Sequence, residues 1–264
     1  MLFDAHLHAF GRPFFAALAN EAAAIPGTLE LPAVLERLRL ELPDEDPVVH
    51  ARAWLKELER NGVDGACVIA SHPAEADHVA AMVAAAGRRF VGASLVNPLA
   101  ADATTRIPQI VERLGLRILL LLPTLHGYHL RDQRWLLDYA ASRDLVLIVQ
   151  CGLLEVPLRT HFGLPRVADP RFGRPLDLVA CAQAHPRITF VVPHLGAGLL
   201  DECLLLGRAC ANVWTDTAGG NGWLAAIGID FEQALSRALA CFGHRRILFG
   251  TDSGGFPRGW RDDV

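Results

Sequence analysis

Eight short apolar runs, separated by segments with helical patterns, constrain the fold of this 264-residue chain more than any other feature. Each run is apolar throughout instead of alternating with polar residues, which is typical of parallel strands buried on both faces. Strands that alternate with helices indicate parallel βαβ units, and eight such units in about 250 residues make a (β/α)8 barrel. The predicted strands cover residues 1–8, 65–70, 90–96, 116–122, 145–150, 188–192, 213–215 and 247–250. We therefore predict an α/β fold of the TIM-barrel type.

A doubly wound open sheet is the alternative fold. It is disfavoured because neither a G-x-G-x-x-G motif nor a P-loop follows the first predicted strand. One feature does not fit a complete barrel, because only residues 253–264 follow the last strand, and they are too few for a full eighth helix. We expect the barrel to be distorted or open there, or covered either by residues 9–47 or by a partner chain in a homodimer.

The chain is predicted to form one domain over residues 1–264, since no linker divides it. Residues 9–47 are predicted to be an irregular insertion with a short helical pattern at 31–40. Because this segment is long for a strand-to-helix connection, it is a candidate lid. A second long loop is predicted at residues 151–172, and substrate specificity is expected to depend on these two segments.

Composition excludes several classes of protein. The net charge is −4 and no basic stripe is present, so nucleic acid is not an expected partner. The most apolar run, residues 114–125, is too short to span a bilayer and contains Arg117, so no membrane association is expected. The six cysteines are scattered without a C-x-x-C pair, which favours a reducing, cytoplasmic compartment. A strand begins at once, so no signal peptide is expected.

Histidines and carboxylates follow the predicted strands at the positions where a barrel carries its chemistry. His6 and His8 are two residues apart in the first strand, so both imidazoles lie on one face and supply half of a metal site. The C-terminal ends of barrel strands meet at one face of the molecule. Polar residues at the ends of the other strands are Ser71, His72, Asn97, Thr124, Gln150, His194, Asp216 and Asp252.

Each of these residues also has a structural interpretation. His194 could be a hydrogen-bonded core histidine, Asp252 could cap a turn, and Asp216 could either support the site or serve the fold. Glu155 and Arg159 could form a loop ion pair or bind a substrate carboxylate. His72, His126 and His129 are expected to be ordinary loop histidines. Four further histidines lie in predicted helices or at their ends and are expected at the surface: His50, His78, His185 and His244.

Three motifs in this order resemble the amidohydrolase superfamily, and most closely the amidohydrolase-related branch, which includes aromatic-acid decarboxylases and lactonases. They are Asp4-Ala5-His6-Leu7-His8, Val192-Pro193-His194-Leu195-Gly196 and Phe249-Gly250-Thr251-Asp252. Supporting motifs follow the fourth strand (Leu122-Pro123-Thr124 with His126-Gly127-Tyr128) and lie at the seventh (Asn212-Val213-Trp214-Thr215-Asp216-Thr217). The resemblance covers nearly the whole chain.

The resemblance implies that His6, His8 and Asp252 bind one divalent metal ion, usually zinc. It assigns His194 as a catalytic histidine or a further ligand, and Asp252 as the group that takes a proton from water. The position where the family has a strand-five histidine ligand is Gln150 here, so His126, His129 or His161 would have to substitute for it. Because the lactonase branch includes members that work without metal, a metal-free site is the alternative. Residues expected to contact substrate are Gln150, Arg159, Glu155, His126 and His161.

The lysine content narrows the chemistry further. Lys56 is the only lysine and lies within a predicted helix. A two-metal site bridged by a carboxylated lysine, or Schiff-base chemistry, needs a lysine at a strand end, so both are excluded.

We therefore expect a metal-dependent hydrolase that cleaves a C–O or C–N acyl bond, as in a lactone, ester or amide, of a small carboxylated or cyclic substrate. One alternative is a non-oxidative decarboxylase of an aromatic or unsaturated acid, in which His194 protonates the carbanion. The other is a degenerate barrel that binds a ligand or partner without turnover. Carbon dioxide release would identify the decarboxylase, and tight ligand binding without turnover would identify the binding protein.

Overall fold

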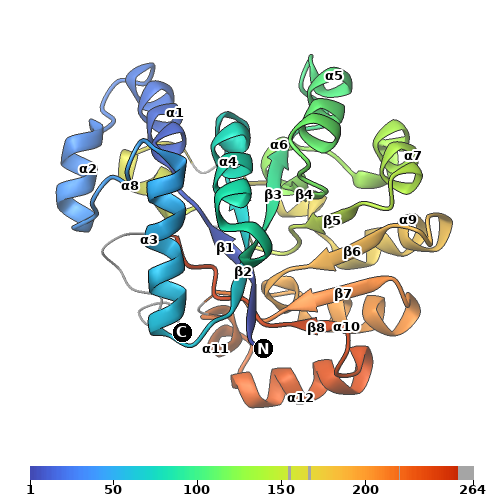
Figure 1. The fold of residues 1–264 in the computed structure, drawn as a ribbon. Helices are drawn as coiled ribbons and strands as arrows, with labels where there is room; N and C mark the ends of the chain where they lie inside the picture. Colours follow the sequence, from blue (N-terminus) through green and yellow to red (C-terminus); the bar gives the residue numbers. More distant parts are fainter. Residues whose placement is uncertain (154–155, 166–167, 220, 255–264) are drawn as a thin grey trace.

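Eight parallel strands form the predicted barrel (Figure 1). The computed structural model describes residues 1–153, 156–165, 168–219 and 221–254. The strands are hydrogen-bonded in sequence order from first to last. Their bounds are β1 Phe3–His8, β2 Gly65–Ala70, β3 Phe90–Val96, β4 Ile118–Leu121, β5 Val146–Val149, β6 Thr189–Val192, β7 Val213–Asp216 and β8 Ile247–Leu248. The prediction of a TIM barrel is confirmed.

Backbone hydrogen bonds between β1 and the chain at and after β8 close the barrel. The Ala5 N–H donates to the Phe249 carbonyl, and the His8 N–H donates to the Ser253 carbonyl, both at 2.8 Å. In the reverse direction, the Asp252 N–H donates to the His6 carbonyl at 2.8 Å. The histidine pair and Asp252 are therefore next to each other because the barrel closes at this seam.

Helices surround the strands on the outside (Figure 1). The α-helices are α1 Arg12–Ala23, α2 Leu31–Leu38, α3 Pro47–Arg60, α4 Ala76–Ala86, α5 Ala103–Pro108, α6 Pro123–His126, α7 Arg134–Ser142, α8 Pro157–Phe162, α9 Val179–Ala184, α10 Leu200–Ala209, α11 Trp223–Ala226 and α12 Phe231–Phe242. Short 3-10 or π turns occupy Pro73–Glu75, Gly87–Arg89, Gln109–Arg113, Leu130–Asp132, Pro170–Phe172, Pro175–Leu178 and His194–Gly196. Within the described residues, no helix combines the length and the apolar character that crossing a membrane requires.

Successive strand residues pack in two separate layers, as the period of two requires. In β5, Val146 and Ile148 belong to a cluster inside the barrel, whereas Leu147 and Val149 pack against the surrounding helices. The inner layer therefore continues upward to Gln150, the next residue in that alternation. This pattern decides which polar side chains reach the mouth of the barrel.

Residues 9–47 are more regular than predicted. The prediction of an irregular insertion was wrong for α1, whose apolar residues recur at helical spacing and whose first turn contains a proline. Phe14, Phe15 and Leu18 pack with Leu158 and Phe162 of α8 in a second apolar cluster. Helix α8 itself lies in the segment that was predicted to be a loop.

The segment between β7 and β8 contains two helices, α11 and α12. The break falls at Gly228, whose φ of +73° suits glycine and interrupts a helix. Asp230 is the N-cap of α12, and its side chain accepts a hydrogen bond from the Gln233 N–H. The Gln233 side chain in turn accepts one from the Asp230 N–H, which completes a capping box.

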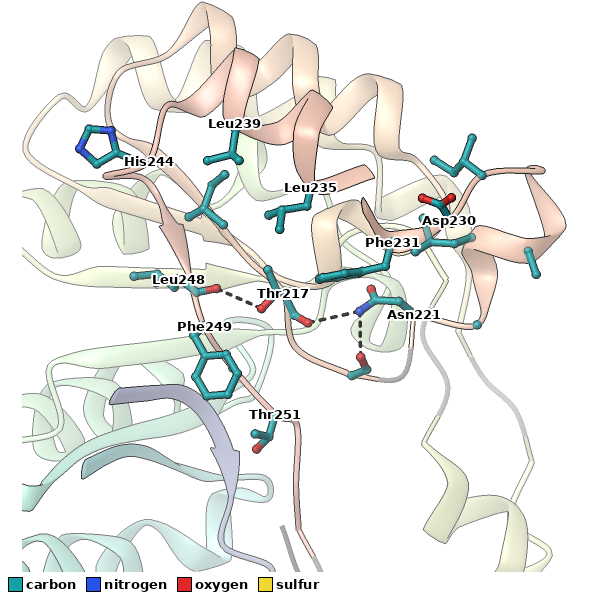
Figure 2. Close-up of a pocket in the computed structure, with 17 residues that line it drawn as sticks. Thr217, Asn221, Asp230, Phe231, Leu235, Leu239, His244, Leu248, Phe249 and Thr251 are labelled. Atoms are coloured by element: carbon teal, nitrogen blue, oxygen red, sulfur yellow. Dashed lines mark hydrogen bonds between the residues drawn. The ribbon is translucent and has the colours of Figure 1, made fainter. Parts of the chain in front are cut away.

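No helix follows β8 within the described part of the chain, which ends there at Gly254. A groove of about 950 Å³ lies beside β8, with apolar walls formed by Phe231, Leu235 and Leu239 of α12 and by Leu248 (Figure 2). Residues 253–264 were predicted to be too few for an eighth helix, and of these, 255–264 lie outside the described residues.

Two helical histidines expected at the surface are buried. His50 of α3 is 1% exposed and His78 of α4 is 9% exposed, and His50 Nδ1 lies 3.0 Å from His78 Nε2. Because one nitrogen must donate and the other accept, this hydrogen bond requires at least one neutral ring. Burial, with the neighbouring His78, lowers the pKa of His50 to about 4. His244 is exposed, as expected.

The buried pair predicts acid sensitivity. Between the ordinary histidine pKa and about 4, the unfolded chain binds a proton at His50 that the folded protein does not, so stability falls as the pH falls. We expect this group to remove about 2 kcal/mol of the free energy of unfolding between pH 7 and pH 5. Urea unfolding at both pH values measures the effect. His50→Asn cannot titrate, so an equal loss in that variant would contradict the assignment.

Candidate active site

A bulge in β1 turns His6 and His8 toward the mouth of the barrel. Phe3 packs inside the barrel, but the register of β1 against β2 shifts between Asp4 and Leu7, and Leu7 packs in the outer layer. A bulge reverses the alternation of side chains beyond it. The residues on either side of Leu7, which are the two histidines, therefore face inward.

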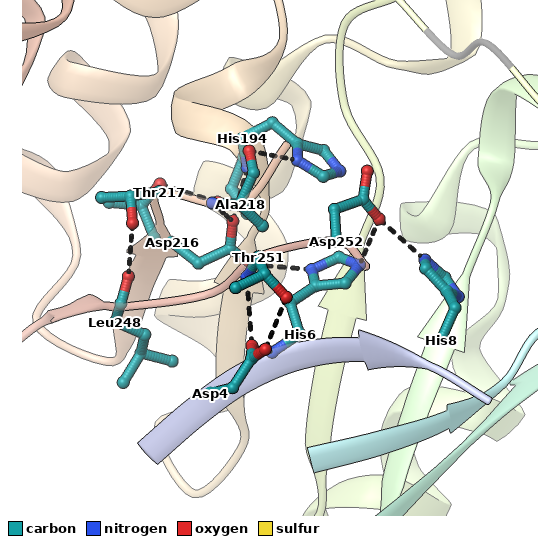
Figure 3. A network of polar contacts seen from close by, with 12 residues as sticks. Asp4, His6, His8, His194, Asp216, Thr217, Ala218, Leu248, Thr251 and Asp252 are labelled. Carbon is teal, nitrogen blue, oxygen red and sulfur yellow. Dashed lines mark hydrogen bonds and ion pairs between the residues drawn. The ribbon is translucent and has the colours of Figure 1, made fainter. Parts of the chain in front are cut away.

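The two imidazoles meet Asp252 at the seam of the barrel (Figure 3). Asp252 Oδ1 lies 2.9 Å from His8 Nε2 and 3.6 Å from His6 Nε2. The His194 ring approaches from β6, with its centroid 5.0 Å from that of His6. Of the described residues, His6, His194 and Asp252 form one group whose possible ligand atoms all lie within 4.8 Å of one another. His8 is not in this group, although its Nε2 is the imidazole nitrogen nearest Asp252 Oδ1.

Each of the three histidines has its Nδ1 occupied by the protein. His6 Nδ1 lies 2.9 Å from Asp216 Oδ2, and His8 Nδ1 lies 2.6 Å from Ser71 Oγ. His194 Nδ1 donates to the Ala218 carbonyl at 2.9 Å. The Nε2 atom of each ring is therefore the one left for chemistry, which is how partner groups orient histidine ligands in metal sites.

Asp216, left open between support and structure, links two of these histidines. It binds the His6 ring through Oδ2, while Oδ1 accepts the backbone N–H groups of His194 at 2.7 Å and Ala218 at 3.1 Å. His194 and the next three residues all have positive φ values, an arrangement that needs such external support. Asp216 is therefore a supporting residue, 1% exposed, beneath the site.

The backbone at Gly219 passes close to the side chains of His194 and Asp252. A β-carbon at Gly219 would lie 3.2 Å from His194 Nδ1 and 3.3 Å from Asp252 Oδ2. Gly219 and Thr251, the latter labelled in Figure 2, also line the groove beside α12, so one end of that groove lies next to the site. Of the groove's described lining residues, none is a histidine or carboxylate of the candidate site.

The charges at the site stabilise one another. Burial opposes ionisation of Asp252, yet the hydrogen bond and charge of His8, with His6 and His194, hold its pKa below the usual range. Burial likewise opposes protonation of His6, but the charge and hydrogen bond of Asp216, with Asp252 and Asp4, raise its pKa to about 9. Burial lowers the pKa of His8, partly offset by Asp252. The negative charge of Asp252 and the positive charge of protonated His6 thus stabilise each other.

These donors fit a divalent metal ion. Two oriented Nε2 atoms and a carboxylate oxygen are a ligand set typical of zinc sites that keep a position open. If both Nδ1 atoms of His6 and His8 carry their protons, both Nε2 lone pairs face the same carboxylate oxygen. A cation or proton between them resolves that repulsion, and an oxygen–nitrogen ligand set suits zinc or a related ion.

Gln150 follows β5 at the position where the family resemblance predicts a histidine ligand. Its Nε2 donates to the Cys151 carbonyl at 3.1 Å and to the Leu153 carbonyl at 3.5 Å, which fixes the orientation of the amide. Among the described residues, His126, His129 and His161 do not belong to the group formed by His6, His194 and Asp252.

Of the remaining residues predicted to contact substrate, those in the described part of the chain do not belong to this group. Arg159 forms two hydrogen bonds with Glu21 of α1, both at 2.6 Å, so its guanidinium is engaged between α8 and α1. Its predicted partner Glu155 lies outside the described residues. His126 ends α6 and its ring stacks near Tyr128, and burial lowers its pKa to about 4. His161 lies on α8.

Sequence reasoning missed two residues that support the site. Asp4 is fully buried and accepts the His6 N–H at 3.0 Å, the Thr251 N–H at 3.1 Å and the Thr251 hydroxyl at 2.5 Å. A buried aspartate inside an apolar strand was the available signal. Ser71 was noted as a strand end, but its contact with His8 depends on the register of β1 and β2 and has no sequence signature.

Comparison with known proteins agrees with this geometry. A family model described as "Amidohydrolase" matches residues 3–263. A search of curated proteins gave no match. Among solved structures, the chain is similar to an uncharacterised TIM-barrel protein from Bordetella bronchiseptica, with a TM-score of 0.64 and 17% identity over 95% of this chain and 85% of that chain.

Two further solved structures share the fold. One is 4-oxalomesaconate hydratase LigJ from Rhodopseudomonas palustris, with a TM-score of 0.60 and 15% identity over 96% of this chain and 81% of that chain. The other is a uronate isomerase from Bacillus halodurans, with a TM-score of 0.52 and 13% identity over 96% of this chain and 79% of that chain. At such identities the similarity shows the fold alone.

Proposed function

Because the chain belongs to the amidohydrolase family, we propose that it is a metal-dependent hydrolase that cleaves a C–O or C–N acyl bond of a small carboxylated or cyclic substrate. The observation that carries the proposal is the convergence of the His6 and His8 Nε2 atoms on Asp252 Oδ1. Zinc is the proposed ion, held by His6, His8 and Asp252, with His194 as a further ligand or catalytic group.

Asp252, His194 and Asp216 have different roles in the proposed hydrolysis. A bound divalent ion would supply Lewis-acid activation of water and of the acyl oxygen. Asp252 holds one oxygen toward the histidines, and its second carboxylate oxygen is available to take the proton of the attacking water. His194 presents Nε2 because Nδ1 is held by Ala218, so it can stabilise the developing oxyanion. Asp216 keeps both His6 and His194 in place.

A decarboxylase could use the same residues, with His194 delivering a proton to the carbanion carbon. The two reactions are separated by assaying zinc-loaded protein against lactones, esters and amides, and by measuring carbon dioxide released from aromatic acids. Hydrolysis without carbon dioxide release supports the proposal. Carbon dioxide release, or ligand binding with no turnover on either panel, contradicts it.

Metal content gives an independent prediction. Protein purified without chelator and supplemented with zinc is expected to retain about one equivalent per chain. His8→Ala removes an Nε2 donor and should reduce retention below about 0.1 equivalent. His126→Ala is the matched control, because the His126 ring stacks near Tyr128, whereas His8 Nε2 lies 2.9 Å from Asp252 Oδ1. Mass-spectrometric metal analysis after gel filtration measures both, and equal retention in the two variants would exclude His8 as a ligand.

A further inference from the structure

Phe10 covers one face of the His8 imidazole. The two rings are stacked, with centroids 5.3 Å apart and planes inclined by 8°. Phe10 also stacks on Phe14 of α1, with centroids 4.5 Å apart. The three rings therefore form one stack that runs from the candidate metal site into the apolar cluster shared by α1, α2 and α8.

The backbone at Phe10 is held in a conformation that a phenylalanine rarely adopts. Its φ is +41°, in the left-handed region that favours glycine, and a bulky residue occupies it only under external constraint. Hydrogen bonds on both sides supply that constraint: the Ala9 N–H donates to the Ile69 carbonyl at 3.2 Å, and the Gly11 N–H donates to Glu75 Oε1 at 2.7 Å. The strained backbone places the ring against His8.

A glycine in the chain after β8 lets the backbone pass close to the Phe10 ring. Gly254 lies against Phe10, and a β-carbon at position 254 would be 2.2 Å from Phe10 Cε2. Glu75, which holds Gly11, also accepts the Ser71 N–H at 2.7 Å, and Ser71 Oγ contacts His8 Nδ1. The buried Glu75 side chain thus supports both residues that contact the His8 ring: Ser71 at its Nδ1 edge and Phe10 at its face.

His8 needs this support more than His6 does. His6 is 2% exposed and its Nδ1 is fixed by a carboxylate, whereas the His8 side chain is 17% exposed and its Nδ1 has only a hydroxyl partner. A hydroxyl can either donate or accept, so it does not by itself fix the ring's tautomer or tilt.

We propose that Phe10 is a positioning residue that holds the His8 ring with Nε2 directed at Asp252, and that it thereby sets the affinity of the site for a divalent ion. The inference rests on the proposed metal-dependent function. Removing Phe10 should release His8 to other orientations without removing any ligand. Because outer partners of metal-binding histidines affect affinity strongly, the effect should be measurable.

Zinc affinity, measured by competition with a chromophoric chelator, tests the proposal. Phe10→Ala is expected to raise the zinc Kd by at least about tenfold. Phe10→Tyr keeps the stacked ring and is expected to restore the Kd to within about twofold of the original. Phe15→Ala is the matched control, because Phe15 belongs to the same apolar cluster and its ring packs edge-on against Phe14, whereas the ring stacked on His8 is Phe10. A Kd for folded Phe10→Ala equal to that of Phe15→Ala would overturn the proposal.

A readout without metal separates this inference from the proposed function. Nitrogen-15 spectra of the histidine rings in the metal-free protein should show one tautomer for His8 in the original chain and an averaged pattern in Phe10→Ala. If the original chain binds no zinc, the proposed function fails, and these spectra still decide the role of Phe10. An unchanged His8 pattern in Phe10→Ala would refute it.

Discussion

Replacing Asp252 by asparagine is expected to reduce kcat for hydrolysis by at least about 10³-fold while the protein remains folded. Asp252 is the carboxylate nearest both His6 Nε2 and His8 Nε2, so the substitution removes the anionic ligand and the proton acceptor together. The fold should tolerate the change because Asp252 has a φ of +61°, a conformation that asparagine adopts more readily than most residues.

The measurement is steady-state kinetics of zinc-supplemented protein, with circular dichroism and thermal unfolding as the folding check. Asp169→Asn is the matched control, since Asp169 is a carboxylate of a barrel loop that pairs with Arg171 away from the histidines. Undiminished turnover in Asp252→Asn would exclude Asp252 from the chemistry. Loss of turnover in the control as well would point to general damage.

Replacing Asp4 by alanine is expected to lower the free energy of unfolding by about 3 kcal/mol. Asp4 is fully buried and accepts the His6 N–H within β1. Across the β1–β8 seam it accepts the backbone N–H and the hydroxyl of Thr251. Alanine leaves those donors unsatisfied in the interior, which costs more than the hydrogen bonds contribute. Because the same contacts join His6 to Asp252, zinc binding should also weaken.

Urea unfolding of the metal-free protein isolates the stability effect. Asp64→Ala is the control, because Asp64 also accepts a backbone N–H at the other end of β1, from Leu2, but lies at the exposed end of the barrel. That variant should cost less than about 1 kcal/mol. Similar losses in the two variants would show that the closing seam is not held by Asp4.

The barrel could be predicted from the sequence because its strands carry a local signal. The β2 and β3 segments are apolar from end to end, and the predicted ranges 65–70 and 90–96 agree with the structure. Helix α1 was missed because Pro13 in its first turn and Pro26 just after it suggested a loop. The packing of Phe14 and Phe15 against α8, which stabilises the helix, joins residues far apart in the sequence.

From the sequence, the candidate site could be predicted only as a list of polar residues at the ends of the strands, without the contacts between them. The H-x-H spacing places two imidazoles on one face, but the bulge that turns that face inward depends on pairing with β2. The assignment of His50 to the surface failed for a similar reason, because the partner that accompanies its burial, His78, comes from the next helix. The stacking of Phe10 on His8 depends on the left-handed backbone conformation of Phe10, which the sequence around Phe10 does not predict.

The central claim is that His6, His8 and Asp252 together hold one divalent ion. Anomalous diffraction from crystals grown with zinc, recorded on both sides of the zinc absorption edge, tests it most directly. The account predicts one strong edge-dependent peak in contact with His6 Nε2, His8 Nε2 and an Asp252 carboxylate oxygen. No peak at these three residues, or zinc bound only elsewhere on the protein, would contradict it.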